Sequence, residues 1–405
     1  MKKVVIIGGG PSGMMAAITA SDNNKVILLD KNEKLGKKLF ITGKGRCNVT
    51  NAKDISDFFE YIPTNPNFLY SALYTFTNEN TIDFFNSRGV KLKTERGDRI
   101  FPQSDKSSDI IKALEKELKS KGVEIKLNSN VEKIFIENKQ IDYIKLRSGE
   151  IIKGDVYILC TGGCSYPQTG SNGEGYKIAR SVGHSIIEPK PALIPIEFKE
   201  QWVKELQGLS LRNVEFSIIN ENKKVLYENF GEMLFTHFGV SGPIVLSGSR
   251  FINNKTNLKA VINLKPALNF QELDNRVQKD FKKYCNKDFK NSLQDLLPKK
   301  IISTIIRLSN VDENKKVNLI TKEERKRLVR VIQNLTFSIK GTRPIAEAIV
   351  TVGGINTKEI DPSTMKSKII ENLSFAGEVI DVDANTGGYN IQIALSTGFL
   401  AGSNI

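Results

Sequence analysis

The sequence of 405 residues contains little of what builds disulfide frameworks, metal centres or membrane spans. Its four cysteines are too few for a disulfide scaffold, and none of them forms a C-x-x-C pair. Its two histidines cannot supply a His-rich metal site. The N-terminal apolar run, Val4 to Ile7, is shorter than the roughly 7–15 residues of a secretory segment, and no stretch approaches the ~18 apolar residues of a membrane span. We therefore expect a reduced, soluble, cytoplasmic protein with no metal and no membrane partner.

Acidic residues are outnumbered by basic ones, with 45 Asp and Glu against 59 Lys and Arg, which gives a net charge of +14. Such an excess attracts nucleic acids, anionic cofactors or acidic surfaces. In segments such as "KALEKELKSKG" and "TKEERKRLVR", however, glutamates alternate with the lysines. This mixing favours a solvated lysine-rich surface over a track for nucleic acid, so we do not expect a nucleic-acid partner.

The N-terminus carries a dinucleotide-binding fingerprint. The β-branched run Val4 to Ile7 predicts a buried parallel strand, and it leads directly into G-x-G-x-x-G at Gly8, Gly10 and Gly13. An Ala-rich helix is expected next, and a second strand ends at Asp30, 22 positions after Gly8. In this motif the first glycine allows a tight turn, the second lets a pyrophosphate approach, and the third permits close packing of helix and strand. Asp30 is expected to bind the adenosine ribose.

FAD and NAD share this fingerprint, so other segments must distinguish them. No second G-x-G-x-x-G follows an apolar strand, which argues against separate FAD and NAD domains. The strand Val156 to Cys160 leads into Thr161-Gly162-Gly163, whose small residues suit a return to the dinucleotide. Near the C-terminus a strand precedes Gly377-Glu378, and Gly387-Gly388 opens the last helix. In two-part FAD domains such an acidic residue holds the ribitol chain, and the helix faces the flavin. This combination favours FAD.

Cys160 and Cys164 are expected to be packing residues rather than a redox pair.

Longer motifs extend the pattern over nearly the whole chain: "GGGPSGMMAA", "KLGKKLFITGKGRCNVTN", "FTHFGVSGPIVL", "AIVTVGGI" and "PSTMKSKIIENLSFAGEVIDVDANTGGYNIQIALSTG". Together they resemble the BaiN-like (YhiN-like) family of FAD-dependent oxidoreductases. The resemblance implies an α/β protein with a glutathione-reductase-type Rossmann FAD domain in two sequence pieces and an inserted β-barrel plus helical domain. That family includes proteins named as bile-acid 3-oxo-Δ4/Δ6 reductases and as aminoacetone oxidases.

The resemblance also implies which residues contact non-covalently bound FAD. Two positions depart from the family pattern, because Asp30 stands where Glu is commoner and Lys44 stands where a third glycine is frequent. The implied FAD contacts are Gly8, Gly10, Pro11, Ser12, Gly13, Asp30, Lys31, Lys38, Thr42, Gly43, Gly45, Arg46, Cys47, Asn48, Val131, Thr161, Gly162, Gly163, Gly377, Glu378, Gly388, Tyr389, Asn390 and Ile391.

The expected layout has three stretches. Residues 1–190 form the first part of the FAD-binding domain, 191–335 an inserted substrate-side domain that is β-rich and then helical, and 336–405 the second part of the FAD-binding domain. Three prolines lie close together at the first of these two domain boundaries: Pro189, Pro191 and Pro195.

A flavin carries its own hydride chemistry, so few catalytic side chains are needed. His237, in "FTHFGVSGP", is the candidate proton donor, or it only shapes its loop by hydrogen bonding to the backbone. We expect flavin-mediated hydride transfer to or from a small organic substrate, with NAD(P)H as a possible transient reductant. Two alternatives are a flavin oxidase of small amines that releases hydrogen peroxide, and a basic FAD protein that binds or modifies RNA. The sequence leaves the substrate and the oligomeric state open.

Overall fold

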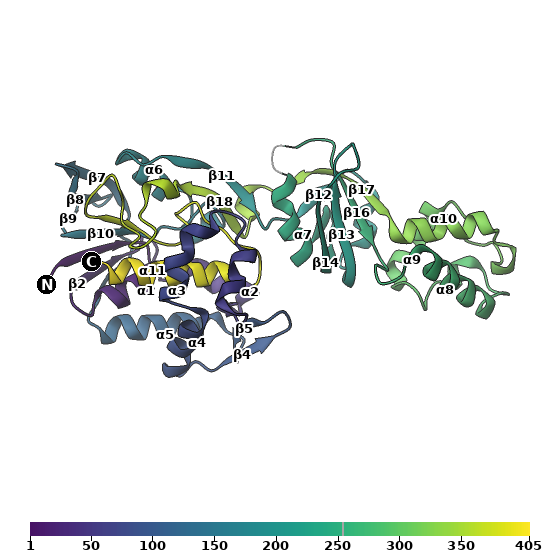
Figure 1. Cartoon of the computed structure of the whole chain (residues 1–405), viewed down its shortest axis with the longest axis horizontal. Helices are drawn as coiled ribbons and strands as arrows, with labels where there is room; N and C mark the ends of the chain where they lie inside the picture. The colour runs from purple at the N-terminus through teal and green to yellow at the C-terminus, as the bar shows by residue number, and fades with distance from the viewer. Residues whose placement is uncertain (253–254) are drawn as a thin grey trace. The chain divides into compact units, whose positions relative to one another are not determined.

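The computed structural model describes residues 1–252 and 255–405, and within them the chain divides into two units. The first unit comprises residues 1–191 and 345–405, and the second comprises residues 192–344 (Figure 1). The first unit is therefore assembled from two sequence pieces. The return into it lies later than the expected boundary at 335, because β17 (Leu335–Thr342) is a barrel strand of the second unit.

Short runs of Val, Ile and Leu form a parallel sheet in the first unit. From one edge to the other its strands are β19 (Leu373–Phe375), β10 (Val156–Leu159), β1 (Lys3–Ile7), β2 (Lys25–Leu29) and β6 (Glu124–Lys126). Val4, Val5 and Ile6 are completely buried. Burial of successive residues, and not of alternate ones, is typical of a parallel strand that is covered on both faces.

The first unit contains the helices α1 (Pro11–Ala20), α2 (Lys37–Gly45), α3 (Tyr70–Thr75), α4 (Asn78–Ser87), α5 (Ser107–Ser120), α6 (Glu174–Ser181) and α11 (Tyr389–Ser403). Helices α1 and α11 pack against each other at close range (Figure 1). A Cβ atom at Gly398 of α11 would lie 2.3 Å from the backbone oxygen of Ser12, and one at Gly402 would lie 2.6 Å from that of Ala16. Glycine at these positions joins the two ends of the chain into one core.

Smaller sheets complete the first unit: β3 (Thr50–Asn51), β5 (Arg99–Pro102) and β4 (Leu92–Glu95) form one, β7 (Val131–Glu137), β8 (Gln140–Leu146) and β9 (Ile151–Ile152) another, and β11 (Ile186–Ala192) pairs with β18 (Val350–Ile355). The sheet β7–β8–β9 is the connection between β6 and β10 of the parallel sheet.

The second unit is built on a closed barrel. Its strands, in order around the barrel, are β12 (Ile196–Phe198), β15 (Gly239–Ser241), β14 (Val225–Phe235), β13 (Ser210–Ile219), β16 (Lys259–Asn263) and β17. Neighbouring strands are antiparallel. Closure leaves none of these strands with an unpaired edge.

The helices of the second unit are α7 (Pro243–Gly248), α8 (Phe270–Lys283), α9 (Lys299–Ser309) and α10 (Lys322–Gln333), of which the last three lie between β16 and β17. Capping boxes at Asn269 and Thr321 start α8 and α10. The buried apolar residues of this unit form a core separate from that of the first unit.

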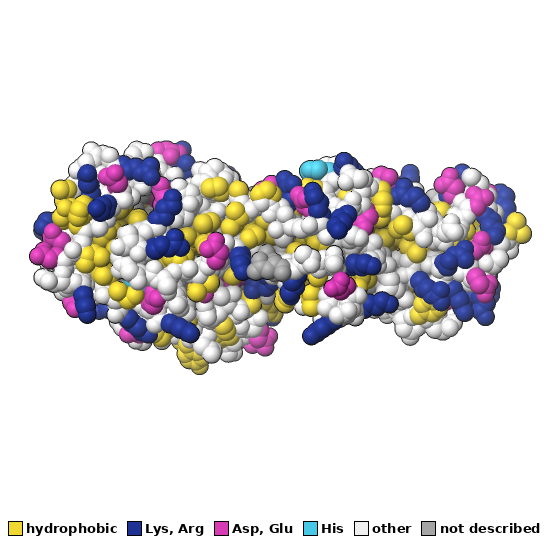
Figure 2. Space-filling model, turned by 90° about the horizontal axis from the view of Figure 1, so that it is seen from above, with side chains coloured by type: hydrophobic (Ala, Val, Ile, Leu, Met, Phe, Trp, Pro, Cys, Tyr) yellow, Lys and Arg dark blue, Asp and Glu magenta, His cyan; other side chains and the backbone are white. Residues whose placement is uncertain are grey.

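Charge is distributed unevenly between the two units. The first unit has 32 Lys and Arg against 29 Asp and Glu, a net charge of +3, whereas the second has 27 against 16, a net charge of +11. Figure 2 shows Lys and Arg side chains, with Asp and Glu side chains among them, over the end of the second unit that α8, α9 and α10 form. Among the described residues, no helix combines the length and the apolar character needed to cross a bilayer.

Candidate functional site

Four segments that the sequence singles out meet at one edge of the parallel sheet. Strands β1, β2, β10 and β19 are parallel, so the residues that follow them lie at the same edge. These residues are Gly8 to Gly10, Asp30, Thr161 to Gly163, and Gly377 with Glu378. The strand order turns back at β1, with β2 on one side and β10 on the other. Ligands of open α/β sheets bind at such a switch point.

The three fingerprint glycines have different surroundings. Gly8 has a φ of +112°, and a Cβ there would lie 2.4 Å from the backbone oxygen of Cys160. A Cβ at Gly13 would lie 1.8 Å from the backbone oxygen of Gly8, so this contact between α1 and β1 requires glycine. Around Gly10 no atom lies within 4 Å of the Cβ position. Gly10 therefore faces open space, and α1 begins beside it without a side-chain cap, so its first N–H groups can bind a phosphate.

The Asp30 carboxylate organises the loop that follows β2. Its Oδ2 accepts the N–H of Gly9 at 2.7 Å, and its Oδ1 accepts the backbone and side-chain N–H groups of Asn32 at 2.7 and 2.9 Å. A carboxylate has about four acceptor sites, so capacity for one ribose hydroxyl remains. The backbone oxygen of Asp30 accepts the N–H of Ser129 at 2.8 Å, which places Val131 two residues beyond this contact. Residues Pro11 and Ser12 form the first turn of α1.

Lys31 lies next to Asp30 but its ammonium group has protein partners. Its Nζ lies 2.6 Å from Glu174 and 2.8 Å from Oδ1 of Asn172. The side chain therefore links the loop after β2 to the start of α6. The expected contact of Lys31 with the cofactor stays a prediction.

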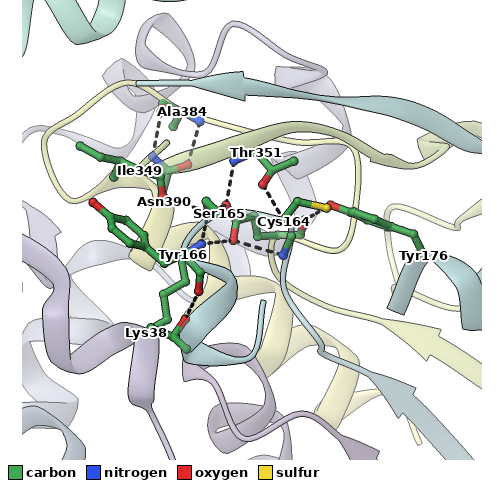
Figure 3. A network of polar contacts seen from close by, with 12 residues as sticks. Lys38, Cys164, Ser165, Tyr166, Tyr176, Ile349, Thr351, Ala384 and Asn390 are labelled. Atoms are coloured by element: carbon green, nitrogen blue, oxygen red, sulfur yellow. Dashed lines mark hydrogen bonds and ion pairs between the residues drawn. The ribbon is translucent and has the colours of Figure 1, made fainter. Parts of the chain in front are cut away.

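A polar network at the same edge includes Lys38, Ser165 and Thr351 (Figure 3), and the Glu378 carboxylate contacts all three. The carboxylate forms an ion pair with Lys38 of α2 at 2.7 Å and accepts the N–H of Thr351 at 3.0 Å and that of Gly163 at 3.3 Å. Ser165 donates to the same carboxylate at 3.4 Å and also contacts Lys38. The network thereby ties α2, β18 and the segment after β10 to the segment after β19.

Sequence reasoning missed Thr351 and Ser165. The Thr351 hydroxyl accepts the N–H of Cys164 at 2.8 Å, and a Cβ at Gly163 would lie 2.5 Å from that hydroxyl oxygen. Thr351 lies within the motif "AIVTVGGI", and this was the available signal. Gly162 has a φ of +70°, and the hydroxyl of Thr161 is buried with no partner among the described residues.

The last turn of α2 departs from helical geometry. Gly43 and Lys44 have φ angles of +57° and +60°, so Lys44 adopts the left-handed conformation where the family often has glycine. Thr42 and Gly45 flank this turn. Just beyond it, Cys47 is completely buried, and burial raises the pKa of its thiol to about 12.

Arg46 follows this turn and is held by acidic partners. It forms ion pairs with Glu95 and with Asp105, and its guanidinium lies 4.3 Å from the centre of the Phe101 ring. The hydrogen bond to Glu95 is the main cause that raises the pKa of Arg46. Asn48, in contrast, has a buried side-chain oxygen with no partner among the described residues. Asn48 is therefore better placed than Arg46 to bind a ligand.

The start of α11 approaches the same region from the C-terminal piece. Gly388 has a φ of +99°, and a Cβ there would lie 2.3 Å from the backbone oxygen of Thr50. No side chain caps this helix, so the first N–H groups, which include that of Ile391, are available. The Asn390 side chain shapes the preceding loop through two hydrogen bonds to Ala384, at 2.9 and 2.7 Å (Figure 3). Tyr389 stacks on Tyr61 with ring centres 4.6 Å apart.

The remaining cysteines and histidines do not form a reactive cluster. Cys160 is buried, and burial raises the pKa of its thiol to about 12, which fits a packing role. His184 is buried between Glu359 and Ser367, and burial lowers the pKa of its imidazole. His237 is exposed in the turn between β14 and β15, so its catalytic role stays a prediction. Within the described ranges no three His, Cys, Asp or Glu side chains are grouped as a metal site would require.

The residues at this edge fit a flavin adenine dinucleotide. Open space beside Gly10 and two uncapped helix starts suit its diphosphate and its flavin, because the diphosphate is anionic and the N1/C2 carbonyl edge of the flavin becomes negative on reduction. The unpartnered buried oxygen of Asn48 indicates a polar position that a ligand would satisfy, whereas the Thr161 hydroxyl lies against Gly175 of α6.

Comparison with known proteins supports this assignment. A family model described as the HI0933-like protein Rossmann domain matches residues 2–404. The chain is 32% identical to the 3-dehydro-bile acid delta(4,6)-reductase of Clostridium scindens, over 99% of this chain and 98% of the relative. It is 30% identical to the ribosomal RNA dihydrouridine synthase of Escherichia coli, over 99% of this chain and 97% of the relative.

Solved structures share the fold at low sequence identity. The 3-ketosteroid delta1-dehydrogenase of Sterolibacterium denitrificans superposes with a TM-score of 0.55 at 12% identity, and the alignment covers 99% of this chain and 98% of that protein. At this identity the likeness concerns the fold alone.

Proposed function

The chain belongs to the HI0933-like family and is an FAD-dependent oxidoreductase, and we propose that it saturates a carbon–carbon double bond conjugated with a carbonyl group in a uracil base of RNA. The two relatives described above support this reaction class. One is named as a delta(4,6)-reductase of a 3-dehydro-bile acid and the other as a dihydrouridine synthase. In a 3-oxo-Δ4,6 steroid and in uracil alike, the double bond is conjugated with a carbonyl group and is therefore electron-poor.

The positive charge of the second unit favours RNA as the substrate. This unit has a net charge of +11, whereas the first has +3. A domain that binds RNA must attract many phosphates, and an excess of Lys and Arg on one domain is the electrostatic footprint of such binding. One steroid carboxylate needs a single cationic partner. We therefore propose RNA as the partner despite the opposite expectation from the mixed charges of the sequence, and this substrate would place the enzyme in the cytoplasm.

When bound, FAD supplies the two-electron chemistry. The chain's own residues bind and orient it: the starts of α1 and α11 present N–H groups, Gly10 leaves room for the diphosphate, and Asp30 accepts from the ribose. The ion pair of Lys38 with Glu378 fixes α2 against the segments that carry the other contacts.

The reductant is proposed to be NAD(P)H, bound transiently. The sequence has a single dinucleotide fingerprint, which we assign to FAD, so the nicotinamide would have no Rossmann site of its own. The overall reaction balances, because the nicotinamide loses a hydride, water supplies a proton, and the double bond gains two hydrogens.

Anaerobic stopped-flow spectroscopy tests this proposal. NADPH or NADH should bleach the flavin band near 450 nm (roughly its usual position), and addition of unmodified ribosomal RNA should restore the absorbance. No bleaching with either nucleotide would exclude the nicotinamide-dependent reductase. Bleaching by a small amine, followed by recovery and release of hydrogen peroxide from oxygen once air is admitted, would instead favour the oxidase alternative.

A second substrate class, a 3-oxo steroid acid, is favoured by the relative from Clostridium scindens. The same experiment separates the two classes. Recovery of absorbance with an unsaturated 3-oxo bile acid but not with RNA would support the steroid substrate and contradict the RNA assignment.

A further inference from the structure

The second unit carries a group of exposed lysines at the end of α8 and in the loop that follows. This group, the lysine strip, comprises Lys279, Lys282, Lys287 and Lys290. All four side chains are exposed, and Lys279 and Lys282 are three positions apart, which puts them on one face of the helix. Figure 2 shows many Lys and Arg side chains over this end of the unit, with Asp and Glu side chains among them.

Three acidic residues near the strip are paired with other cations. Asp280 pairs with Arg276 at 3.0 Å, and Asp288 pairs with Lys316 at 2.7 Å. Asp295 pairs with Lys283 at 2.7 Å. Within the described residues no lysine of the strip forms an ion pair with a carboxylate; the ammonium of Lys290 contacts only the Asn314 side-chain oxygen, at 2.8 Å. The strip therefore presents four lysines that form no ion pair in the described part of the chain, and Asp288 interacts with Lys290 only at longer range.

Two observations argue that these lysines do more than keep the surface soluble. Lysines in the last turn of a helix stabilise the helix dipole, and this accounts for Lys282. It does not account for Lys279, which lies farther from the end, or for Lys287 and Lys290, which lie beyond it. In addition, the Lys287 ammonium lies 4.6 Å from the centre of the Tyr284 ring, a cation–π contact that holds this charge close to the end of α8.

We propose that the lysine strip binds the phosphate backbone of the RNA substrate. This inference rests on the proposed function and assigns to α8 and its following loop a docking role outside the FAD unit. Phosphate contacts from lysines position an RNA but do not read its sequence. The strip should therefore contribute affinity for every RNA of similar shape and little preference between sequences.

The test compares two triple variants of the full-length FAD-loaded protein. One is K279Q/K282Q/K287Q, and its matched control is K112Q/K116Q/K119Q on α5. The control lysines are also exposed, also lie on one helix, and form no ion pair within the described residues. Binding of a fluorescent ribosomal RNA fragment is measured by anisotropy from 50 to 300 mM salt (on the order of the range in which such binding weakens).

The strip variant should weaken binding. The negative slope of log K against log salt should become shallower by about 2 to 3, since each lost phosphate contact reduces its magnitude by about 1. The α5 control should keep the wild-type slope. A K279R/K282R/K287R variant, which retains the charges, should bind like the wild type. Equal flavin content and melting temperature in all variants would confirm that they are folded.

The outcomes separate the strip from the proposed function. If the wild type reduces uridine in RNA and the strip variant binds with the wild-type slope, the proposed role of the lysine strip is wrong and the proposed function stands. If the wild type itself shows no salt-dependent RNA binding, both fail. If the α5 control loses as much slope as the strip variant, binding is a non-specific effect of net charge, and the strip is again overturned.

Discussion

The fingerprint glycines show how single residues can serve opposite purposes within six positions of the chain. Gly13 is enclosed, since a Cβ there would meet the backbone oxygen of Gly8 at 1.8 Å. Gly10 faces open space and has an ordinary φ of −78°. Gly13 therefore allows close packing within the protein, and Gly10 leaves room for a ligand to approach.

Alanine substitutions should separate these two roles. Gly13→Ala should destabilise the protein without cofactor by about 1–3 kcal/mol, because the added methyl overpacks the contact between α1 and β1. Gly10→Ala should leave that stability nearly unchanged but weaken FAD binding roughly tenfold or more, which corresponds to about 1.4 kcal/mol of lost contact. Thermal melts of the apoprotein and titration with FAD measure both effects. Normal FAD affinity in Gly10→Ala would contradict the placement of the diphosphate.

His184 should make stability depend on pH. Burial lowers the pKa of its imidazole, although the nearby Glu359 carboxylate opposes this. As the pH falls from about 6.5, the ordinary value, the unfolded chain takes up a proton before the folded one does, so stability decreases towards the lower folded-state pKa. His184→Gln should remove the contribution of His184 to the pH dependence of the free energy of unfolding, which is at most about 1.4 kcal/mol per pH unit. Melting temperatures of both proteins between pH 7.5 and 5.5 (about one unit on either side of the ordinary value) measure the difference, and identical pH slopes would contradict it.

At the scale of elements, the candidate site depends on segments that four strands bring to one edge. The ion pair of Lys38 with Glu378 joins α2 to the segment after β19, and both side chains are about one-fifth exposed (21% each). Such partial burial makes the pair stronger than an ion pair on the surface.

A double-mutant cycle with Lys38→Met and Glu378→Gln should give a coupling free energy of about 1 kcal/mol or more in apoprotein unfolding. The exposed pair of Lys153 with Asp142, at 2.9 Å, serves as the control and should give about 0.5 kcal/mol or less. A coupling at Lys38 and Glu378 no larger than in the control would show that this pair does not hold α2 in place.

The sequence predicted those parts of the site that have a local signal. A short apolar run followed by glycine identified the ends of β1, β10 and β19, because strand and turn chemistry lie next to each other in the chain. The partners of Arg46 and Lys31 could not be predicted in this way. Glu95, Asp105 and Glu174 lie in segments without a motif, and only the fold brings them to these cations.

At the scale of the whole molecule, the two units have separate apolar cores and different charges. The proline-rich segment indicated the first crossing between them, but the second lies at residue 344, since β17 pairs with both β12 and β16. Sequence alternation alone does not show which sheet a strand joins. The difference in net charge between the two units also becomes apparent only when the charges are counted for each unit separately.

Separate cores predict that FAD stabilises one unit more than the other. In calorimetry the unfolding of the first unit should shift upward with FAD, by about 2.7 kcal/mol at a hundredfold excess over Kd, and the transition of the second unit should stay in place. A single transition that moves as a whole would contradict independent unfolding of the units.

The central claim, reduction of a uracil base in RNA, is tested most directly by mass spectrometry of nucleosides. The FAD-loaded protein is incubated with NADPH and unmodified ribosomal RNA, and the RNA is then digested. We expect a nucleoside two hydrogens heavier than uridine, which forms only when FAD and NADPH are both present. RNA that stays unchanged while the same preparation oxidises NADPH with an unsaturated 3-oxo bile acid would contradict it.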